Sequence, residues 1–285
     1  MSFTLAVLGG SGLYEMEGLS NVTEIDVDTP FGRPSDVVVR GTLANGTTML
    51  FLPRHGRGHR VPPHAINYRA NVCALKKAGA THLVSVSAVG SMKEEIEPGH
   101  LVVPDQFVDL TKKRVSTFFE DGIVGHVPFA DPVCSLLAGA LGQAAEKAGS
   151  KVHAGGAYVC IEGPQFSTRA ESLIYRSWGV SVIGMTSMPE AKLAREAELP
   201  FATLALATDY DCWHDSHDDV TVEAVVATMK KNVGQAKKTL LELSSILPDP
   251  TRSIAHGVTK GAVMTAPNAI TEAAKARLSW LLPAG

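Results

Sequence analysis

The sequence predicts a single α/β domain in which helices cover both faces of a central mixed β-sheet, giving three α/β/α layers. Apolar runs of strand length alternate along the chain with segments of helical periodicity, which is typical of this class. Most of the runs are continuously apolar rather than alternating, as expected for strands buried on both faces. No repeat, low-complexity tract or linker divides the first 245 residues, so we expect one domain over residues 1–285.

The predicted strands are these continuous apolar runs, and residues that break a strand follow two of them. The first run ends at Gly9-Gly10, and Pro53 follows the third. We expect strands at residues 3–8, 37–39, 48–52, 82–86, 101–103, 157–161, 180–184 and 202–207.

Helices are expected between these strands, at residues 63–78, 133–148, 168–177, 190–198 and 222–244. Residues 248–268 are rich in Pro, Gly, Ser and Thr, which indicates a surface connection over residues 245–270. A C-terminal helix is expected at residues 271–283, with Leu278, Leu281 and Leu282 as its apolar stripe. That stripe must pack either on its own domain or on a neighbouring subunit.

Composition excludes several classes of function. The chain is 45% hydrophobic and 19% charged with a net charge of −3, so it has no basic surface typical of nucleic-acid or membrane binding. No apolar stretch approaches the roughly 20 residues that span a bilayer, and the start lacks a charged leader, so we expect a cytoplasmic protein. The four cysteines are widely separated, which argues against a zinc ribbon and against a disulfide framework.

Two carboxylates follow the last predicted strand. In an extended segment residues i and i+2 face the same way, so Asp209 and Asp211 are expected to converge on one ligand. Two like charges so close resist joint ionisation, so one carboxyl is expected to hold a proton near neutral pH. Such a pair suits a site that donates a proton to a ring nitrogen and accepts one from an exocyclic amine. The alternative is a pair of aspartates that caps the following helix.

Three other strand ends carry groups that could bind an anion. Gly9-Gly10-Ser11-Gly12 resembles a phosphate loop, but it matches neither the dinucleotide fingerprint nor the Walker A sequence. Arg54 and His55 offer a forked donor and a second donor to a phosphate edge, and the small residues 85–91 could close on the same anion. The alternatives are tight glycine turns and a solvated basic loop.

An apolar subsite is indicated by two further turns. Phe166 follows a Gly-Pro turn and could stack on a ring, and Met185 with Thr186 ends another strand. Each of these side chains could instead belong to the core. The run 214–219 is rich in His and Asp, but its spacing matches no ligand pattern, so we expect no metal there. Because these groups follow strand ends, they indicate one pocket at the carboxyl edge of the sheet.

Together these residues resemble the purine nucleoside phosphorylase superfamily, in its trimeric branch, and within it most closely the 5′-methylthioadenosine phosphorylase family. The resemblance rests on segments that occur in the expected order between about residues 9 and 245. They are Gly9-Gly10-Ser11-Gly12-Leu13, residues 28–32, 54–57 and 67–71, Ile161-Glu162-Gly163-Pro164, Phe166-Ser167, residues 169–172, Gly184-Met185-Thr186 and Thr208-Asp209-Tyr210-Asp211-Cys212-Trp213. Residues 248–268 match the family least.

The resemblance implies a set of site residues. The phosphate would be bound by Ser11, Arg54, His55, Ser87, the N–H of Ala88, and Thr186. The nucleoside would meet Phe166 and Met185 at the ribose, Ser167, Asp209 and Asp211 at the base, and Val222 and Val225 at the methylthio group. His126 and Leu281 would reach the site from a neighbouring subunit, so the resemblance implies a homotrimer.

The implied reaction is phosphorolysis of 5′-methylthioadenosine to adenine and 5-methylthioribose 1-phosphate, with phosphate as co-substrate and no metal or organic cofactor. Asp209 and Asp211 would be the catalytic carboxylates, with Asp209 donating a proton to N7. One alternative is a phosphorylase of 6-oxopurine nucleosides such as inosine, guanosine or methylthioinosine, which places an asparagine where Asp209 stands. Another is a non-catalytic nucleoside-binding protein on the same fold.

Overall fold

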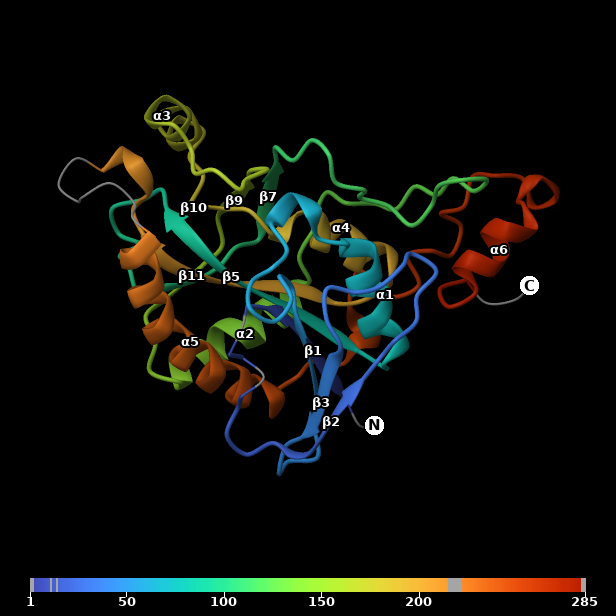
Figure 1. Ribbon diagram of the computed structural model, residues 1–285, viewed down its shortest axis with the longest axis horizontal. Helices are drawn as coiled ribbons and strands as arrows, with labels where there is room; N and C mark the ends of the chain where they lie inside the picture. Colours follow the sequence, from blue (N-terminus) through green and yellow to red (C-terminus); the bar gives the residue numbers. More distant parts are fainter. Residues whose placement is uncertain (1–2, 11, 14, 215–221, 283–285) are drawn as a thin grey trace.

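The computed structural model describes residues 3–10, 12–13, 15–214 and 222–282, with the side chains of residues 222–227 left aside. Within these residues it contains an 11-stranded mixed sheet and helices on both of its faces (Figure 1). The strands are β1 (Thr4–Gly9), β2 (Ser20–Ile25), β3 (Val38–Thr42), β4 (Thr48–Pro53), β5 (His82–Ser91), β6 (Leu101–Val103), β7 (Gln106–Asp109), β8 (Val152–Ala154), β9 (Ala157–Cys160), β10 (Val182–Gly184) and β11 (Phe201–Asp209).

The helices are α1 (Tyr68–Lys77), α2 (Ser135–Lys147), α3 (Arg169–Ser177), α4 (Ser187–Glu196), α5 (Val222–Ser244) and α6 (Glu272–Leu278), with short 3-10 helices η1 (Pro63–Ala65), η2 (Asp211–Trp213), η3 (Pro250–Arg252) and η4 (Pro267–Ala269). The sheet order is β2-β3-β4-β1-β5-β10-β9-β7, and β11 pairs with both β5 and β6. β5 is parallel to β1 and β11 but antiparallel to β10, which confirms the predicted mixed sheet.

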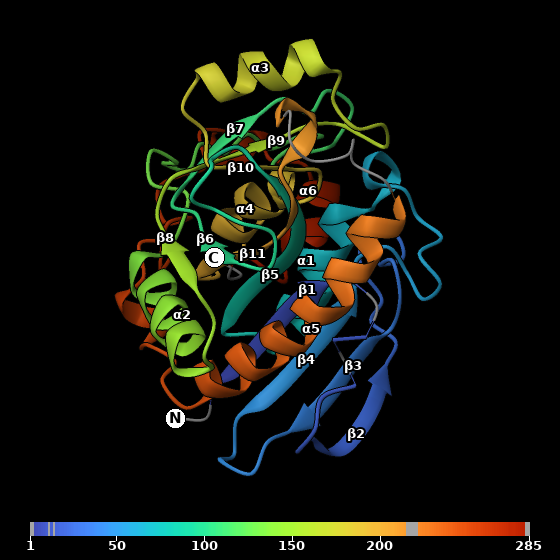
Figure 2. The same cartoon turned by 90° about the vertical axis from the view of Figure 1, so that its left-hand side faces the viewer.

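The helical layers explain why the predicted strands are continuously apolar. α2 and α5 lie on one face of the sheet, and α1 and α4 lie on the other (Figure 2). In β1, Leu5 and Val7 belong to the core beneath α2 and α5, whereas Ala6 and Leu8 belong to the core beneath α1 and α4. Both faces of the strand are therefore buried, and both require apolar side chains. α3 stands apart from these layers, beside η2.

Some element boundaries differ from those expected. α1 begins at Tyr68 rather than at residue 63, because the Asn67 side chain accepts a hydrogen bond from the Ala70 N–H at 3.1 Å and caps the helix. β2, β7 and β8 were not predicted. The β2 sequence SNVTEI is almost entirely exposed and carries one strongly apolar residue before its last position, so it lacks the pattern of a buried strand.

The C-terminal prediction is correct in part. α6 ends at Leu278, and the expectation that the helix continues to residue 283 is wrong, because the N–H groups of Ser279 and Leu281 bond three residues back, to the Ala276 and Leu278 carbonyls, as in a tighter turn. The predicted surface connection is also more buried than expected, since Ala255 and Ala262 are buried within it. Within the described residues no helix is long and apolar enough to cross a membrane, and all four cysteines are free thiols.

Candidate functional site

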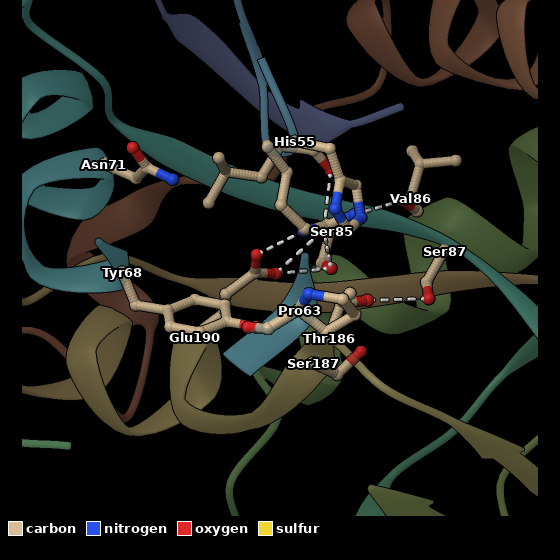
Figure 3. Close-up of polar contacts among 12 residues, drawn as sticks. His55, Pro63, Tyr68, Asn71, Ser85, Val86, Ser87, Thr186, Ser187 and Glu190 are labelled. Atoms are coloured by element: carbon tan, nitrogen blue, oxygen red, sulfur yellow. Dashed lines mark hydrogen bonds and ion pairs between the residues drawn. The ribbon is translucent and has the colours of Figure 1, made fainter. Parts of the chain in front are cut away.

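The candidate site lies where β1, β4, β5 and β11 end at the same edge of the sheet. Gly9 pairs with Pro53 at the ends of β1 and β4, and Asp209 of β11 pairs with Gly90 of β5. Figure 3 shows His55, Ser87, Thr186 and Glu190 gathered in this region. The parallel strands therefore bring together residues that are far apart in the sequence, as expected for an open α/β sheet.

The two carboxylates meet through a turn rather than through an extended segment. β11 ends at Asp209, and Asp211 opens η2 with a positive φ of 54°. The Asp211 N–H donates to Asp209 Oδ1 at 2.8 Å, and Thr208 Oγ1 lies 2.7 Å from Asp209 Oδ2. The expectation that the i and i+2 side chains share one face of a strand is wrong, although the two residues do lie together.

Both carboxyls are packed tightly against neighbouring elements. Ser172 of α3 donates from Oγ to Asp211 Oδ2 at 2.5 Å. A Cβ at Gly90 would lie 3.0 Å from Asp209 Oδ1 and 3.2 Å from the Asp211 Cβ, so the glycine provides the space that the pair occupies. The alternative of a helix cap applies to the short η2, where the carboxylates accept from the Asp211 and Cys212 amides, whereas the residues that precede α5 lie outside the described residues.

Burial raises the pKa of both carboxyls above the ordinary aspartate value. For Asp209 the negative charge of Asp211 adds to this effect, whereas the hydrogen bonds from Thr208 and from the Asp211 N–H oppose it. For Asp211 burial outweighs the hydrogen bond from Ser172. Burial, rather than mutual repulsion, is therefore the largest cause of the perturbation.

The guanidinium fork of Arg54, which was expected to bind phosphate, is occupied by a carboxylate of the protein itself. Its Nε donates to Glu190 Oε1 at 2.5 Å and its Nη2 donates to Glu190 Oε2 at 2.9 Å, with 2% and 0% of the two side chains exposed. Further bonds reach Ser85 Oγ and the carbonyls of residues 8 and 86. Burial opposes the Arg54 charge, but the ion pair more than offsets it and raises the pKa. The sequence prediction missed Glu190 because a lone glutamate in a helix carries no signal of its partner.

His55 is a neutral side chain with a free ring nitrogen. Its Nδ1 lies 2.8 Å from the Val61 carbonyl, which can only accept, so Nδ1 carries the proton and Nε2 carries a lone pair. Burial and the neighbouring Arg54 charge lower the His55 pKa to about 4. His59 stacks on the ring at 4.2 Å between centroids. His55 was expected to be a donor, but in this state its Nε2 accepts, which suits the hydroxyl of a protonated phosphate.

This pKa predicts a loss of stability in acid. The unfolded chain binds a proton at His55 near pH 6.5, whereas the folded chain does so only near pH 4, so stability falls as the pH drops below the unfolded value. Between pH 7.5 and pH 5 we expect this residue to cost about 2 kcal/mol of unfolding free energy. Urea unfolding of wild type and His55→Asn at both pH values measures it. An equal loss in both proteins would contradict the assignment.

Two hydroxyls of the predicted phosphate residues lie next to each other in the site. Ser87 Oγ of β5 lies 2.9 Å from Thr186 Oγ1, and both residues are buried. Ala88 follows Ser87 in β5, opposite Leu206 of β11. The structure therefore brings together five of the predicted phosphate residues, with Arg54 facing Glu190. The sixth, Ser11, lies outside the described residues.

The predicted nucleoside residues divide into two groups. Ser167 Oγ is buried and has no hydrogen-bond partner among the described residues, and 51% of Phe166 is exposed. Met185 contacts the loop before them, because a Cβ at Gly163 would lie 2.5 Å from its sulfur. Cys212 Sγ lies 3.4 Å from the Ser167 carbonyl, which ties this loop to the carboxylate turn. An unpartnered buried hydroxyl and an exposed aromatic face beside the carboxylates are features of a ligand site.

The other group does not join the site within one chain. The backbone N–H of the exposed His126 donates to the Ala262 carbonyl at 2.9 Å, in the segment that runs beside α6 in Figure 1, away from α3. Leu281 packs on the core beneath α1 and α4. The side chains of Val222 and Val225 lie outside the described residues, as do residues 215–219 of the His- and Asp-rich run.

No group of three or more potential ligands able to hold a metal ion occurs in the part of the chain that the structure describes. A cavity of about 220 Å³ is lined by residues 64–69 and 113–115. None of its lining residues was expected to bind the phosphate or the nucleoside. The candidate site is therefore defined by its polar groups at the sheet edge rather than by this cavity.

Comparison with known proteins gives the family. The model of the phosphorylase superfamily matches residues 4–245. S-methyl-5′-thioadenosine phosphorylase of Geobacter sulfurreducens is 55% identical over 283 residues, which cover 99% of each chain. The enzyme of the same name from Hyperthermus butylicus is 52% identical over 245 residues, covering 86% of this chain and 88% of its own.

Solved structures agree with this relationship. A methylthioadenosine phosphorylase from an antarctic soil metagenomic library superimposes with a TM-score of 0.93 at 47% identity, over 99% of both chains. The Schistosoma mansoni methylthioadenosine phosphorylase in complex with adenine gives 0.87 at 36% identity, over 92% of this chain and 99% of its own. The chain belongs to the phosphorylase superfamily and, within it, to the S-methyl-5′-thioadenosine phosphorylase family.

Proposed function

We propose that this protein catalyses the phosphorolysis of 5′-methylthioadenosine to adenine and 5-methylthioribose 1-phosphate. The observation that carries the proposal is the carboxylate pair of the half-buried Asp209 and the buried Asp211, together with the unpartnered hydroxyl of Ser167 in the adjoining loop. Relatives at about 50% identity over nearly the whole chain are S-methyl-5′-thioadenosine phosphorylases. At this position a protonated carboxyl can donate its proton to N7, and a carboxylate can accept from the 6-amino group of adenine.

The reaction needs the phosphate and the base to lie on opposite sides of a sugar. Ser87 and Gly90 are three residues apart in β5, a span of roughly 10 Å, which leaves room for the ribose between the two subsites. A phosphate oxygen would bond to the anomeric carbon as the glycosidic C–N bond breaks, and the electron pair of that bond would pass to the purine. A proton from Asp209 at N7 would neutralise the leaving base.

The roles of the other residues follow the geometry. We propose that phosphate is bound by His55, Ser87, Thr186, the Ala88 N–H and Ser11. Arg54 would contribute mainly through its ion pair with Glu190, which holds the ends of the surrounding strands in place. Phe166 and Met185 would line the ribose, and Val222 and Val225 the methylthio group. No step of this chemistry requires a metal or an organic cofactor, because phosphate is the nucleophile and a carboxyl is the acid.

We also propose a homotrimer that works in the cytoplasm. His126 and Leu281 lie away from the sheet edge in their own chain, so they could complete the site only of a neighbouring subunit. Four free cysteines suit a reducing compartment. Light scattering of the purified protein would measure the assembly.

The proposed activity is tested by turnover. Purified protein is expected to release adenine from 5′-methylthioadenosine only when phosphate is added, and to prefer this substrate to adenosine, inosine and methylthioinosine. Ultraviolet assays of the four nucleosides, each with and without phosphate, measure this preference. Faster cleavage of inosine or methylthioinosine would show a 6-oxopurine phosphorylase instead, and binding without turnover would show a nucleoside-binding protein.

A further inference from the structure

Arg114 occupies the centre of a buried network that joins two loops of the candidate site. Its side chain is 0% exposed although it follows two lysines in the sequence, a pattern typical of a solvated surface. The guanidinium Nε donates to Glu162 Oε1 at 2.9 Å, forming an ion pair. The same Glu162 carboxylate accepts from the N–H groups of Lys112 and Lys113, which holds the Arg114 backbone beside it.

The remaining N–H groups of Arg114 reach backbone carbonyls. Nη2 donates to the carbonyls of Ile161 and Glu162, at 3.2 and 2.7 Å. Nη1 donates to the carbonyls of Met185 and Met188, both at 2.6 Å. Two separate chain segments, one after β9 and one after β10, are therefore fastened to a single side chain.

Tyr68 completes the network from α1. Its hydroxyl lies 2.9 Å from Arg114 Nη1, where it shares the two N–H groups of that nitrogen with the Met185 and Met188 carbonyls, and it donates to the Pro63 carbonyl at 2.8 Å. The centroid of the Tyr68 ring also lies 5.3 Å from the guanidinium carbon of Arg114. The plane of the guanidinium is thus fixed from several directions.

These two segments carry the predicted nucleoside and phosphate contacts. Residues 161–163 lead directly to Phe166 and Ser167, and Met185 immediately precedes Thr186. The close packing of Gly163 on the Met185 sulfur shows that the segments also touch each other. A shift of either segment relative to Arg114 would change the distance between the base subsite and the phosphate subsite.

We propose that Arg114 is a positioning residue for phosphorolysis, which sets the spacing between the loop of Phe166 and Ser167 and the turn of Met185 and Thr186. This inference rests on the proposed function, because it assigns these two loops to one nucleoside and one phosphate. Arg114 itself is assigned no contact with the nucleoside or with the phosphate. Lysine cannot replace it, since an ammonium has three donors on one atom and cannot span carbonyls on two segments.

The test compares three variants with wild type. Arg114→Lys is expected to lower kcat/KM for 5′-methylthioadenosine by about 100-fold and to raise the KM for phosphate as well, because misplacing reacting groups by about 1 Å has an effect of this size. Glu162→Gln keeps an acceptor for Arg114 Nε but loses the charge and one backbone contact, so a fall of about tenfold is expected. Lys192→Met is the control, because the Lys192 ammonium pairs with Asp109 at 2.6 Å rather than with a group of either loop.

Unchanged kinetic constants in folded Arg114→Lys would overturn the inference. A fall of kcat/KM in Lys192→Met as large as that in Arg114→Lys would overturn it as well. Should Arg114→Lys fail to fold, Glu162→Gln decides, because a purely structural role would lower its melting temperature and leave both KM values unchanged. Wild-type turnover is measured first. If wild type cleaves another purine nucleoside instead, the proposed function fails while the Arg114 inference is tested on that substrate.

Discussion

Asp209→Asn is expected to lower kcat for 5′-methylthioadenosine by about 10²–10⁴-fold, because an amide cannot donate the proton that the adenine leaving group requires. The fold should persist. The amide oxygen can still accept from the Asp211 N–H, and the amide nitrogen can donate to Thr208 Oγ1, whose hydroxyl is then free to bond to the Val89 carbonyl 3.2 Å away. Steady-state kinetics with saturating phosphate measure the effect.

The same substitution should shift preference toward 6-oxopurine nucleosides, since an amide can donate to a 6-oxo group. Asp26→Asn is a matched control that neutralises an exposed carboxylate away from the site, and it should leave turnover within twofold of wild type, about 0.4 kcal/mol in barrier height. Turnover of Asp209→Asn close to the wild-type rate would show that the proton comes from elsewhere, with Asp211 the next group to test.

Glu190→Gln is expected to lower the free energy of unfolding by about 3–5 kcal/mol, because it leaves the buried Arg54 charge without its partner. Glutamine keeps the size of the side chain, so the loss reports the charge rather than a cavity. Its amide nitrogen would also face the donors of Arg54 and Ser85, which now converge on Glu190 Oε2 at 2.9 and 2.7 Å. Urea unfolding at pH 7.5 measures the change.

The exposed pair Arg57 and Glu24 offers the control for this prediction. Their atoms also lie 2.6 Å apart, but 40% and 56% of the two side chains are exposed, so Glu24→Gln should cost less than about 1 kcal/mol. An equal loss of unfolding free energy in Glu190→Gln and Glu24→Gln would mean that burial of the Arg54–Glu190 pair does not increase its contribution to stability. A large loss only in Glu190→Gln would support a structural rather than a direct phosphate role for the Arg54 fork.

The fold class was predictable because a strand buried on both faces of the sheet has apolar residues at every position. Runs such as Leu5 to Leu8 are apolar at every position, since alternate side chains enter the two cores. The sequence of β2 lacks such a continuous apolar run, because most of its side chains are exposed. The helix ends were less predictable, as α1 depends on the Asn67 cap and α6 ends where the chain turns at Leu278.

The candidate site was predictable as a set of strand ends but not in its internal pairing. Asp209 and Asp211 stand together in the sequence, yet their contact comes from the turn at η2 and from the space left at Gly90. Ser172, which bonds to Asp211, lies 39 positions away, so no local pattern could have identified it. The roles proposed for His126 and Leu281 in the site of a neighbouring subunit come from the family resemblance alone.

The sequence alone determined which residues are apolar on both faces, which small and polar groups follow the strands, and hence the family and the edge of the sheet that holds the site. Only the tertiary structure decided what those groups do to one another. It directed the Arg54 fork to Glu190, left His55 neutral and buried Arg114 between two loops. The reason is that hydrogen bonds and charge depend on partners and burial, which are set by packing between distant segments rather than by neighbours in the chain.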